Sequence, residues 1–138
     1  MGIEAFVMNY RDGNVAPIAL DRILKIFDTP DTAWNTQYNY LHAVFTDPCD
    51  YVAIYCGHDA LATGETSGLT IVRPIIHPDF LERLYRVLQL DNAMLFYSDE
   101  TTPVFHPSAD PSHYPDDLLQ TLGSPRIAHC PTDLFHQC

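Results

Sequence analysis

Two histidines and a carboxylate lie close together in the last third of the chain: His106, Asp110 and His113. Imidazole nitrogens and carboxylate oxygens are ligands that zinc binds in proteins, and His129 or His136 could complete a set of four. However, two prolines restrict this segment, and its spacing matches no known metal motif. We therefore predict no metal and no cofactor, and we keep His106, Asp110 and His113 as the triplet to test for a metal.

A thiol and an imidazole are near neighbours at Cys56-Gly57-His58. A cysteine nucleophile needs a thiolate with a base beside it, but the glycine turn can separate these side chains, and Cys56 lies in an apolar run typical of the core. Cys49 lies between Asp47 and Asp50, whose carboxylates disfavour a thiolate. The chain also lacks a Gly-x-Ser-x-Gly segment, a P-loop and a dinucleotide fingerprint. These observations favour a protein that is not an enzyme.

Carboxylates in turns and at a helix start form the largest set of candidate binding residues. Each has a local reason, because Asp favours turns and the first turn of a helix. Loops that join adjacent strands can nevertheless gather at one end of a sheet, where they would form an acidic rim beside aromatic side chains. Such a surface suits a protein partner better than a small molecule. The predicted binding residues are Asp47, Asp50, Asp99, Glu100, Asp110, Asp116 and Asp117, with Trp34 and Tyr114 beside them.

The charge balance narrows the class of partner. The net charge is −11, from 18 acidic against 7 basic residues. This balance disfavours nucleic acid, whose phosphates are bound mainly through Lys and Arg, and it disfavours an anionic membrane surface. It suits a protein partner with a basic surface, because complementary charge speeds encounter. A simpler interpretation is that the net negative charge serves only to keep the protein soluble.

Among the elements that must position these residues, the segment 78–90 has the clearest secondary-structure signal in the sequence. Apolar residues recur there at helical spacing from Phe80 to Leu88, and Pro78 suits the first helical position. The apolar run at 93–98 is typical of a buried strand, and we expect it to form a hairpin with 101–105. Elsewhere the patterns predict strands over 3–9, 40–45, 51–56, 69–73 and 126–130, helices over 17–27 and 115–122, and irregular segments at 34–40, 57–68 and 106–114.

Predicted strands cluster in pairs rather than alternating strictly with helices. This order favours an α+β fold with a mainly antiparallel or mixed sheet and about three helices packed on one face. The length predicts a single domain over 1–138, with 131–138 as a tail. No apolar window approaches the roughly 20 residues of a membrane span, and the N-terminus lacks the basic region of a secretory signal. We expect a cytoplasmic protein with reduced cysteines.

Three segments carry a resemblance to known proteins: 2–7, 88–96 and 117–126, which read GIEAFV, LQLDNAMLF and DLLQTLGSPR. Together they resemble small, acidic, uncharacterised bacterial proteins, some of which are linked to toxin–immunity systems. Those families have no strict catalytic motif. The resemblance therefore implies a stoichiometric binder rather than an enzyme, and it assigns no role to any single residue.

We therefore predict a protein-binding module. Its most specific form is an immunity or inhibitor protein that neutralises a basic toxin or enzyme through an acidic loop surface. The alternative is a small hydrolase or transferase that uses His and Asp of the 99–117 loops. That alternative requires a deep pocket lined by His106 or His113 together with a carboxylate. A structural domain that forms a homodimer is a third reading, and it requires a symmetric apolar interface.

Overall fold

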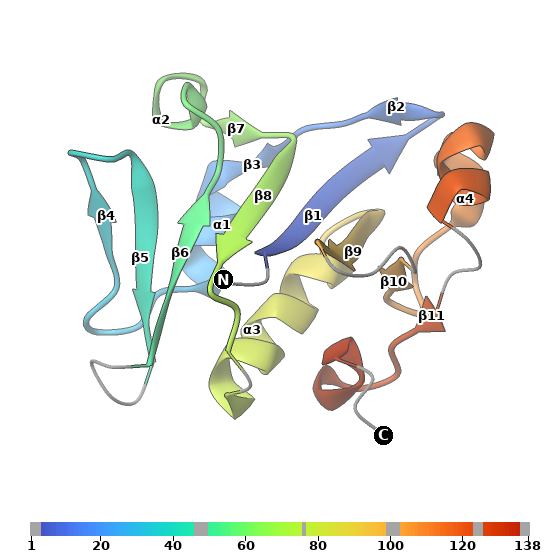
Figure 1. Cartoon of the computed structure of the whole chain (residues 1–138). Coiled ribbons are helices and arrows are strands. Elements are labelled where there is room, and N and C mark those ends of the chain that lie inside the picture. Colours follow the sequence, from blue (N-terminus) through green and yellow to red (C-terminus); the bar gives the residue numbers. More distant parts are fainter. Residues whose placement is uncertain (1–3, 46–49, 76, 99–102, 123–125, 136–138) are drawn as a thin grey trace.

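The computed structural model describes residues 4–45, 50–75, 77–98, 103–122 and 126–135. A mixed sheet runs through the whole molecule, with four α-helices and two 3-10 helices among the described residues (Figure 1). The strands are β1 (Glu4–Arg11), β2 (Asn14–Val15), β3 (Ile18–Ala19), β4 (Ala33–Asn35), β5 (Tyr40–Val44), β6 (Tyr51–Tyr55), β7 (Glu65–Thr66), β8 (Gly68–Val72), β9 (Ala93–Tyr97), β10 (Val104–Phe105) and β11 (Arg126–Ile127). The helices are α1 (Leu20–Ile26), α2 (Ala60–Thr63), α3 (Pro78–Gln89), α4 (Asp116–Leu122), η1 (Pro111–His113) and η2 (Pro131–Phe135).

The sheet is built outward from β1. The strand order is β11-β10-β9-β1-β8-β6-β5-β4, with β2 paired to β1, while β3 and β7 form a separate small sheet. The β10–β11 pair is parallel, and every other pair among the described strands is antiparallel. The predicted α+β class and mixed sheet are therefore confirmed.

The register of β1 decides which side chains share a face. Phe6 lies opposite Thr70 of β8 and opposite Phe96 of β9. Because side chains alternate along a strand, these three share one face of the sheet, and Ala5 and Val7 lie on the other. That second face is the buried one, with Ala5 and Val7 only 0% and 1% exposed.

Helix α3 covers the buried face and matches its prediction from the sequence. Pro78 occupies its first turn, and the ring Nδ1 of His77 accepts a hydrogen bond from the Asp79 backbone N–H at 3.1 Å. Such a bond satisfies one of the free N–H groups of the first turn. Figure 1 places α1 next to α3 behind the sheet, and Arg83 of α3 reaches the Ile26 carbonyl of α1 at 2.6 Å. The two helices therefore cover the main core side by side.

A second core cluster lies on the opposite face, at the β9–β10 end of the sheet. It contains Tyr10, Met94, Phe105 and Tyr114, and Leu118 of α4 packs against it. The expectation of helices on one face only is therefore wrong, because η1 and α4 cover part of the second face. The sequence of β9 explains this, since the adjacent residues Met94 and Leu95 point to opposite faces of the sheet and both are buried.

Several segments differ from the sequence-based expectation because they pair with, or pack against, residues that are distant in the sequence. Helix α1 begins at Leu20 rather than at residue 17, because Ile18 and Ala19 pair with β7. The predicted loop at 57–68 contains α2 and β7, and the irregular segment at 34–40 begins in β4. The predicted tail contains η2, whose Leu134 is 0% exposed. The β9–β10 hairpin is confirmed by the Leu95–Val104 pairing, although its turn lies outside the described residues.

None of the helices in the described part of the chain has the length and apolarity needed to cross a bilayer.

Candidate functional site

The most distinctive surface is the second face of the sheet over β5, β6, β8 and the first half of β1. Burial alternates along these strands, so that Val52 and Ile54 are buried while Tyr51, Ala53 and Tyr55 between and beside them reach solvent. No described helix covers this part of the sheet. We call it the uncovered face, and it consists of Phe6, Tyr40, His42, Tyr51, Ala53, Tyr55, Thr70, Val72 and Phe96.

Rings on the uncovered face contact one another across strands. Phe6 and Phe96 are stacked, with ring centroids 5.3 Å apart. Tyr40 lies 5.1 Å from Tyr55 and 6.2 Å from His42, whose ring in turn lies 4.8 Å from Tyr51. These contacts hold the rings against one another, and each ring remains at least partly exposed. Rigid aromatic side chains of this kind are enriched in the centres of protein interfaces.

A groove of about 750 Å³ opens beside this face, where β1, β6 and β8 meet the segment from α2 to β7. Its floor is shaped by Gly68, where an added Cβ would lie 2.6 Å from Met8 Sδ and 2.8 Å from the Val7 carbonyl oxygen. Its walls include Tyr38 and Tyr55, and its charged side chains are Asp59 and Glu65. The volume is in the range of about 300–1,000 Å³ typical of ligand sites.

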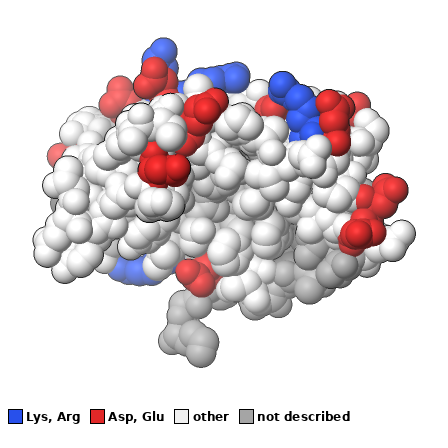
Figure 2. All heavy atoms as spheres, turned by 90° about the horizontal axis from the view of Figure 1, so that it is seen from above, with Lys and Arg blue, Asp and Glu red and all other residues white. Residues whose placement is uncertain are grey.

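Acidic side chains do not form one patch on the end of the molecule where α2 and β2 lie. Figure 2 looks down on that end and shows several separate acidic groups, toward the margin and also left of the centre, with a broad area between them that carries no Lys, Arg, Asp or Glu. The acidic side chains on this end of the molecule are therefore dispersed rather than gathered into one patch.

The predicted acidic rim is divided between two ends of the sheet. Asp50 immediately precedes β6, and the pairings Ala53–Val72 and Val72–Glu4 put that end of β6 beside the start of β1. Asp110 lies just before η1, which contacts the other end of β1: the Gly13 N–H donates to the His113 carbonyl at 2.9 Å. Exposed Asp116 and Asp117 follow in α4. Asp47, Asp99 and Glu100 lie outside the described residues.

The two aromatic residues predicted to bind a partner have internal contacts. Trp34 is half-buried against the main core, and its indole N–H donates to Asn39 Oδ1 at 3.2 Å. Tyr114 is only 3% exposed, stacks on Phe105 at 4.7 Å, and donates its hydroxyl to the Asn92 carbonyl at 2.8 Å. Burial raises the pKa of Tyr114. Tyr114 is therefore part of the interior rather than of a binding surface.

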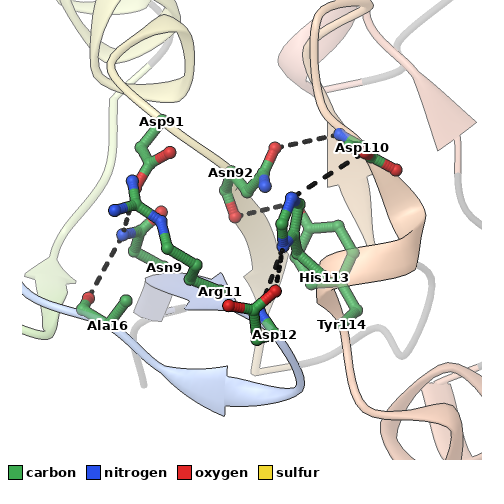
Figure 3. A network of polar contacts seen from close by, with 9 residues as sticks. All are labelled: Asn9, Arg11, Asp12, Ala16, Asp91, Asn92, Asp110, His113 and Tyr114. Atoms are coloured by element: carbon green, nitrogen blue, oxygen red, sulfur yellow. Dashed lines mark hydrogen bonds and ion pairs between the residues drawn. The ribbon is translucent and has the colours of Figure 1, made fainter.

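A polar network ties the tip of the β1–β2 hairpin to the turn after α3 (Figure 3). The side-chain amide of buried Asn9 donates to the Ala16 carbonyl at 3.2 Å and to Asp91 Oδ2 at 3.0 Å. Arg11 donates to the same carboxylate oxygen at 2.7 Å. Burial alone would raise the pKa of Asp91, but the hydrogen bonds from Asn9 and Arg11 and the charge of Arg11 hold it below its ordinary value.

The candidate metal triplet is not brought together. His106 turns toward α3, with its ring 4.9 Å from that of Tyr85 and its Nε2 3.1 Å from Gln89 Nε2, and burial lowers its pKa. His113 instead accepts a hydrogen bond from the Asp12 N–H at 3.0 Å, and its Nε2 lies 3.8 Å from Asp110 (Figure 3). Within the described residues, no group of three or more His, Cys, Asp or Glu is placed to hold a metal.

The thiol of Cys56 is unsuited to nucleophilic attack. Cys56 is 2% exposed, and burial raises its pKa to about 12. Its neighbour His58 is exposed, and the intervening Gly57 has a φ of 100° that turns the chain away from the strand. A thiol of this pKa is protonated at neutral pH, whereas a nucleophile must be a thiolate. The structure therefore places Cys56 in the core, as its apolar surroundings in the sequence indicate.

Sequence reasoning missed the uncovered face, although the signal was present. In β6, Tyr51 and Tyr55 alternate with Val52 and Ile54, which is the pattern of a strand with one face in solvent. Such a pattern shows that one face is accessible, but it does not show that neighbouring strands bring more rings to the same face. That information lies in the strand order.

Neither models of protein families, nor curated proteins, nor solved structures gave a match to this chain. The resemblance to toxin–immunity proteins therefore stays a prediction.

Proposed function

We propose that the chain is a protein-binding module that recognises a protein with a basic surface, and that the uncovered face is its contact surface. The single observation that carries this proposal is the row of rings on that face. Soluble proteins seldom leave large apolar groups side by side in water without a use for them. Here Phe6 stacks on Phe96, and the Tyr40 ring lies tilted against that of Tyr55 at 5.1 Å, and all four rings keep part of their surface exposed.

Charge supports the choice of partner. The net charge of −11 attracts a basic protein over a distance of about a Debye length, roughly 8–10 Å at physiological ionic strength. Interface centres are depleted in charged residues, whereas their rims are polar. Aromatic contacts on the uncovered face, with the acidic Asp59 and Glu65 in the groove beside it, fit that arrangement better than one acidic rim does.

The most specific form of the proposal is an immunity or inhibitor protein that neutralises a basic toxin or enzyme. In that form the module acts by occupying its partner's surface, so it needs no catalytic group of its own. The alternative, a hydrolase or transferase using His106 or His113, requires a deep pocket lined by one of these histidines together with a carboxylate. The groove beside α2 and a second groove between α3 and Pro131 are lined by neither histidine.

Site-specific photocrosslinking in the cell that encodes the protein tests this proposal. The photoreactive residue p-benzoylphenylalanine replaces Tyr55, which is 37% exposed on the uncovered face. In the matched control it replaces exposed Arg22 on α1, on the other side of the sheet. We expect a covalent adduct with a basic protein from position 55 and none from position 22. No adduct at 55, equal adducts at both positions, or an acidic partner would each contradict the proposal.

The immunity form has a test of its own. The protein recovered in the adduct is expressed alone and together with this chain, and cell growth is measured. We expect growth to stop in the first case and to continue in the second. A recovered protein that is harmless when expressed alone would restrict the proposal to binding.

A further inference from the structure

The groove beside the uncovered face has an unbalanced set of charged side chains. Asp59 and Glu65 contribute to its lining, and Lys and Arg do not. Asp59 precedes α2 at the capping position, yet its side chain makes no capping hydrogen bond. Neither carboxylate forms an ion pair with any residue in the described part of the chain. Both are therefore available to a cation from outside.

Two tyrosine rings stand over the same groove. Tyr38 is 64% exposed and Tyr55 is 37% exposed, which is unusual for side chains that gain free energy from burial. A cation close to the face of such a ring is attracted by the negative potential of its π-electrons, and the attraction grows when water is displaced.

The backbone at Tyr38 is held in place before any partner arrives. The Tyr38 backbone N–H donates to Asn35 Oδ1 at 2.9 Å, which holds the β4–β5 turn in shape. The next residue, Asn39, has a φ of 58° and donates its side-chain amide to the His58 carbonyl at 3.0 Å. This second bond joins the turn to the loop between β6 and α2. A preformed wall lowers the entropy lost on binding.

Small residues line the floor of the groove. Gly57 has no side chain, and Ser67 and Thr70 offer hydroxyl oxygens that can accept hydrogen bonds. The Thr66 hydroxyl is already used, since it donates toward the Cys56 and Gly68 carbonyls at 2.7 and 2.6 Å. A planar group can therefore enter between the tyrosines and still meet oxygen acceptors.

These features together select one cationic side chain. A guanidinium group is planar, stacks on aromatic rings and presents several N–H donors that match carboxylate oxygens, whereas an ammonium group is a compact, strongly hydrated charge. We infer that the groove receives an arginine side chain presented by the basic partner, with its guanidinium between Tyr38 and Tyr55 and its charge neutralised by Asp59 and Glu65. This inference rests on the proposed function, because it assigns to that partner a residue for this groove.

A titration followed by amide NMR tests the groove without the partner. The probe is acetyl-Gly-Arg-Gly-amide, and the same peptides with citrulline and with lysine serve as comparisons. We expect the arginine peptide to shift the amide resonances of Gly57, Ser67 and Gly68 in a saturable way. Citrulline, which has the same shape without the charge, leaves them unchanged, and lysine binds more weakly.

Two double variants locate the binding. Asp59→Asn with Glu65→Gln keeps the shape of the groove and removes its charge, and we expect the dissociation constant to rise by about tenfold or more. Asp28→Asn with Asp31→Asn changes the net charge equally at exposed positions between α1 and β4 and leaves the constant unchanged. Equal loss in both variants, equal binding of citrulline or lysine, or no binding of the arginine peptide would overturn the inference.

The two proposals fail in different ways. If the Tyr55 adduct still forms but the arginine peptide does not bind, the groove inference is wrong and the binding module stands. If the peptide binds as expected but no Tyr55 adduct forms, the proposed function is wrong.

Discussion

Asn9 and Asp91 are 82 residues apart in the chain, and a hydrogen bond of 3.0 Å joins their side chains. This bond links the centre of the sheet to the end of the main helix. It also depends on charge, because the carboxylate of Asp91 accepts from Asn9 and Arg11 at the same time.

Replacing Asp91 with Asn lowers stability at neutral pH. The pKa of Asp91 is lowered in the folded protein, so its charged form favours folding above the unfolded pKa of about 4 and loses that effect as pH falls through the folded value. A hydrogen bond to a charged group contributes about 1.5–3 kcal/mol. We expect Asp91→Asn to lower the free energy of unfolding by about 1–2 kcal/mol at pH 7, measured by urea denaturation.

The control for that measurement is Asp31→Asn at an exposed position. We expect Asp31→Asn to change the unfolding free energy by less than about 0.5 kcal/mol. The difference between the wild-type protein and Asp91→Asn shrinks as pH falls from 5 to 2. A difference that stays constant over this range would show that charge is not the cause.

Gly68 is required by close packing rather than by its backbone angles. Any Cβ there would meet the Val7 carbonyl oxygen at 2.8 Å and Met8 Sδ at 2.6 Å. The methionine can move, but the carbonyl is fixed within β1. We expect Gly68→Ala to lower the free energy of unfolding by about 1–3 kcal/mol.

A double-mutant cycle with Met8→Ala separates the two contacts. Removing the methionine sulfur should relieve only part of the cost of Gly68→Ala. If Gly68→Ala costs nothing in the Met8→Ala background, the backbone oxygen is not the limiting contact.

Alkylation tests the environment of the thiols. The pKa of Cys56 is raised to about 12, and its side chain is buried, whereas Cys130 is exposed. We expect iodoacetamide at pH 8 to modify Cys130 and to leave Cys56 unmodified in the native protein, as read by peptide mass spectrometry. Both should react after unfolding in urea. Rapid modification of native Cys56 would instead support the nucleophile that the Cys56-Gly57-His58 sequence suggests.

Local signals explain which parts of the fold the sequence predicts. Pro78 and the apolar spacing that follows it fix α3 within its own residues, and the apolar run after Asn92 does the same for β9. Ile18 and Ala19 carry no such signal, because they become β3 only through pairing with β7. The same holds for η2, which is ordered through contacts such as the Tyr97 hydroxyl bonded to the Leu134 carbonyl at 2.9 Å.

The candidate site depends even more on strand order. Among the described acidic residues, Asp50 and Asp110 lie outside helices and strands and Asp116 and Asp117 lie in the first turn of α4, as expected. Asp50 and Asp110 are nevertheless separated by the length of β1. Phe6 and Phe96 meet because β1 and β9 are neighbours, although 90 positions separate them in the printed sequence. Composition and periodicity describe each strand alone, so neither could show that rings from separate strands meet on one face.

The rings of the uncovered face should contribute less to folding than the rings of the core. Tyr40 and Tyr55 contact each other at 5.1 Å and keep part of their surface in solvent, so truncating either removes less buried surface than truncating a core ring. We expect Tyr40→Ala and Tyr55→Ala each to lower the unfolding free energy by about 1–2 kcal/mol, with a coupling of about 0.5–1 kcal/mol between them. Phe80→Ala, at a position that is 0% exposed, should cost about 3–5 kcal/mol and serves as the core reference.

This comparison separates a surface used for binding from one used for folding. We expect chemical denaturation to show moderate losses for the two tyrosine variants and a clearly larger loss for the phenylalanine variant. Losses for the tyrosine variants as large as that of Phe80→Ala would place the rings among the groups that hold the fold together. Their presence on the surface would then need no partner, and the main support for a binding face would be lost.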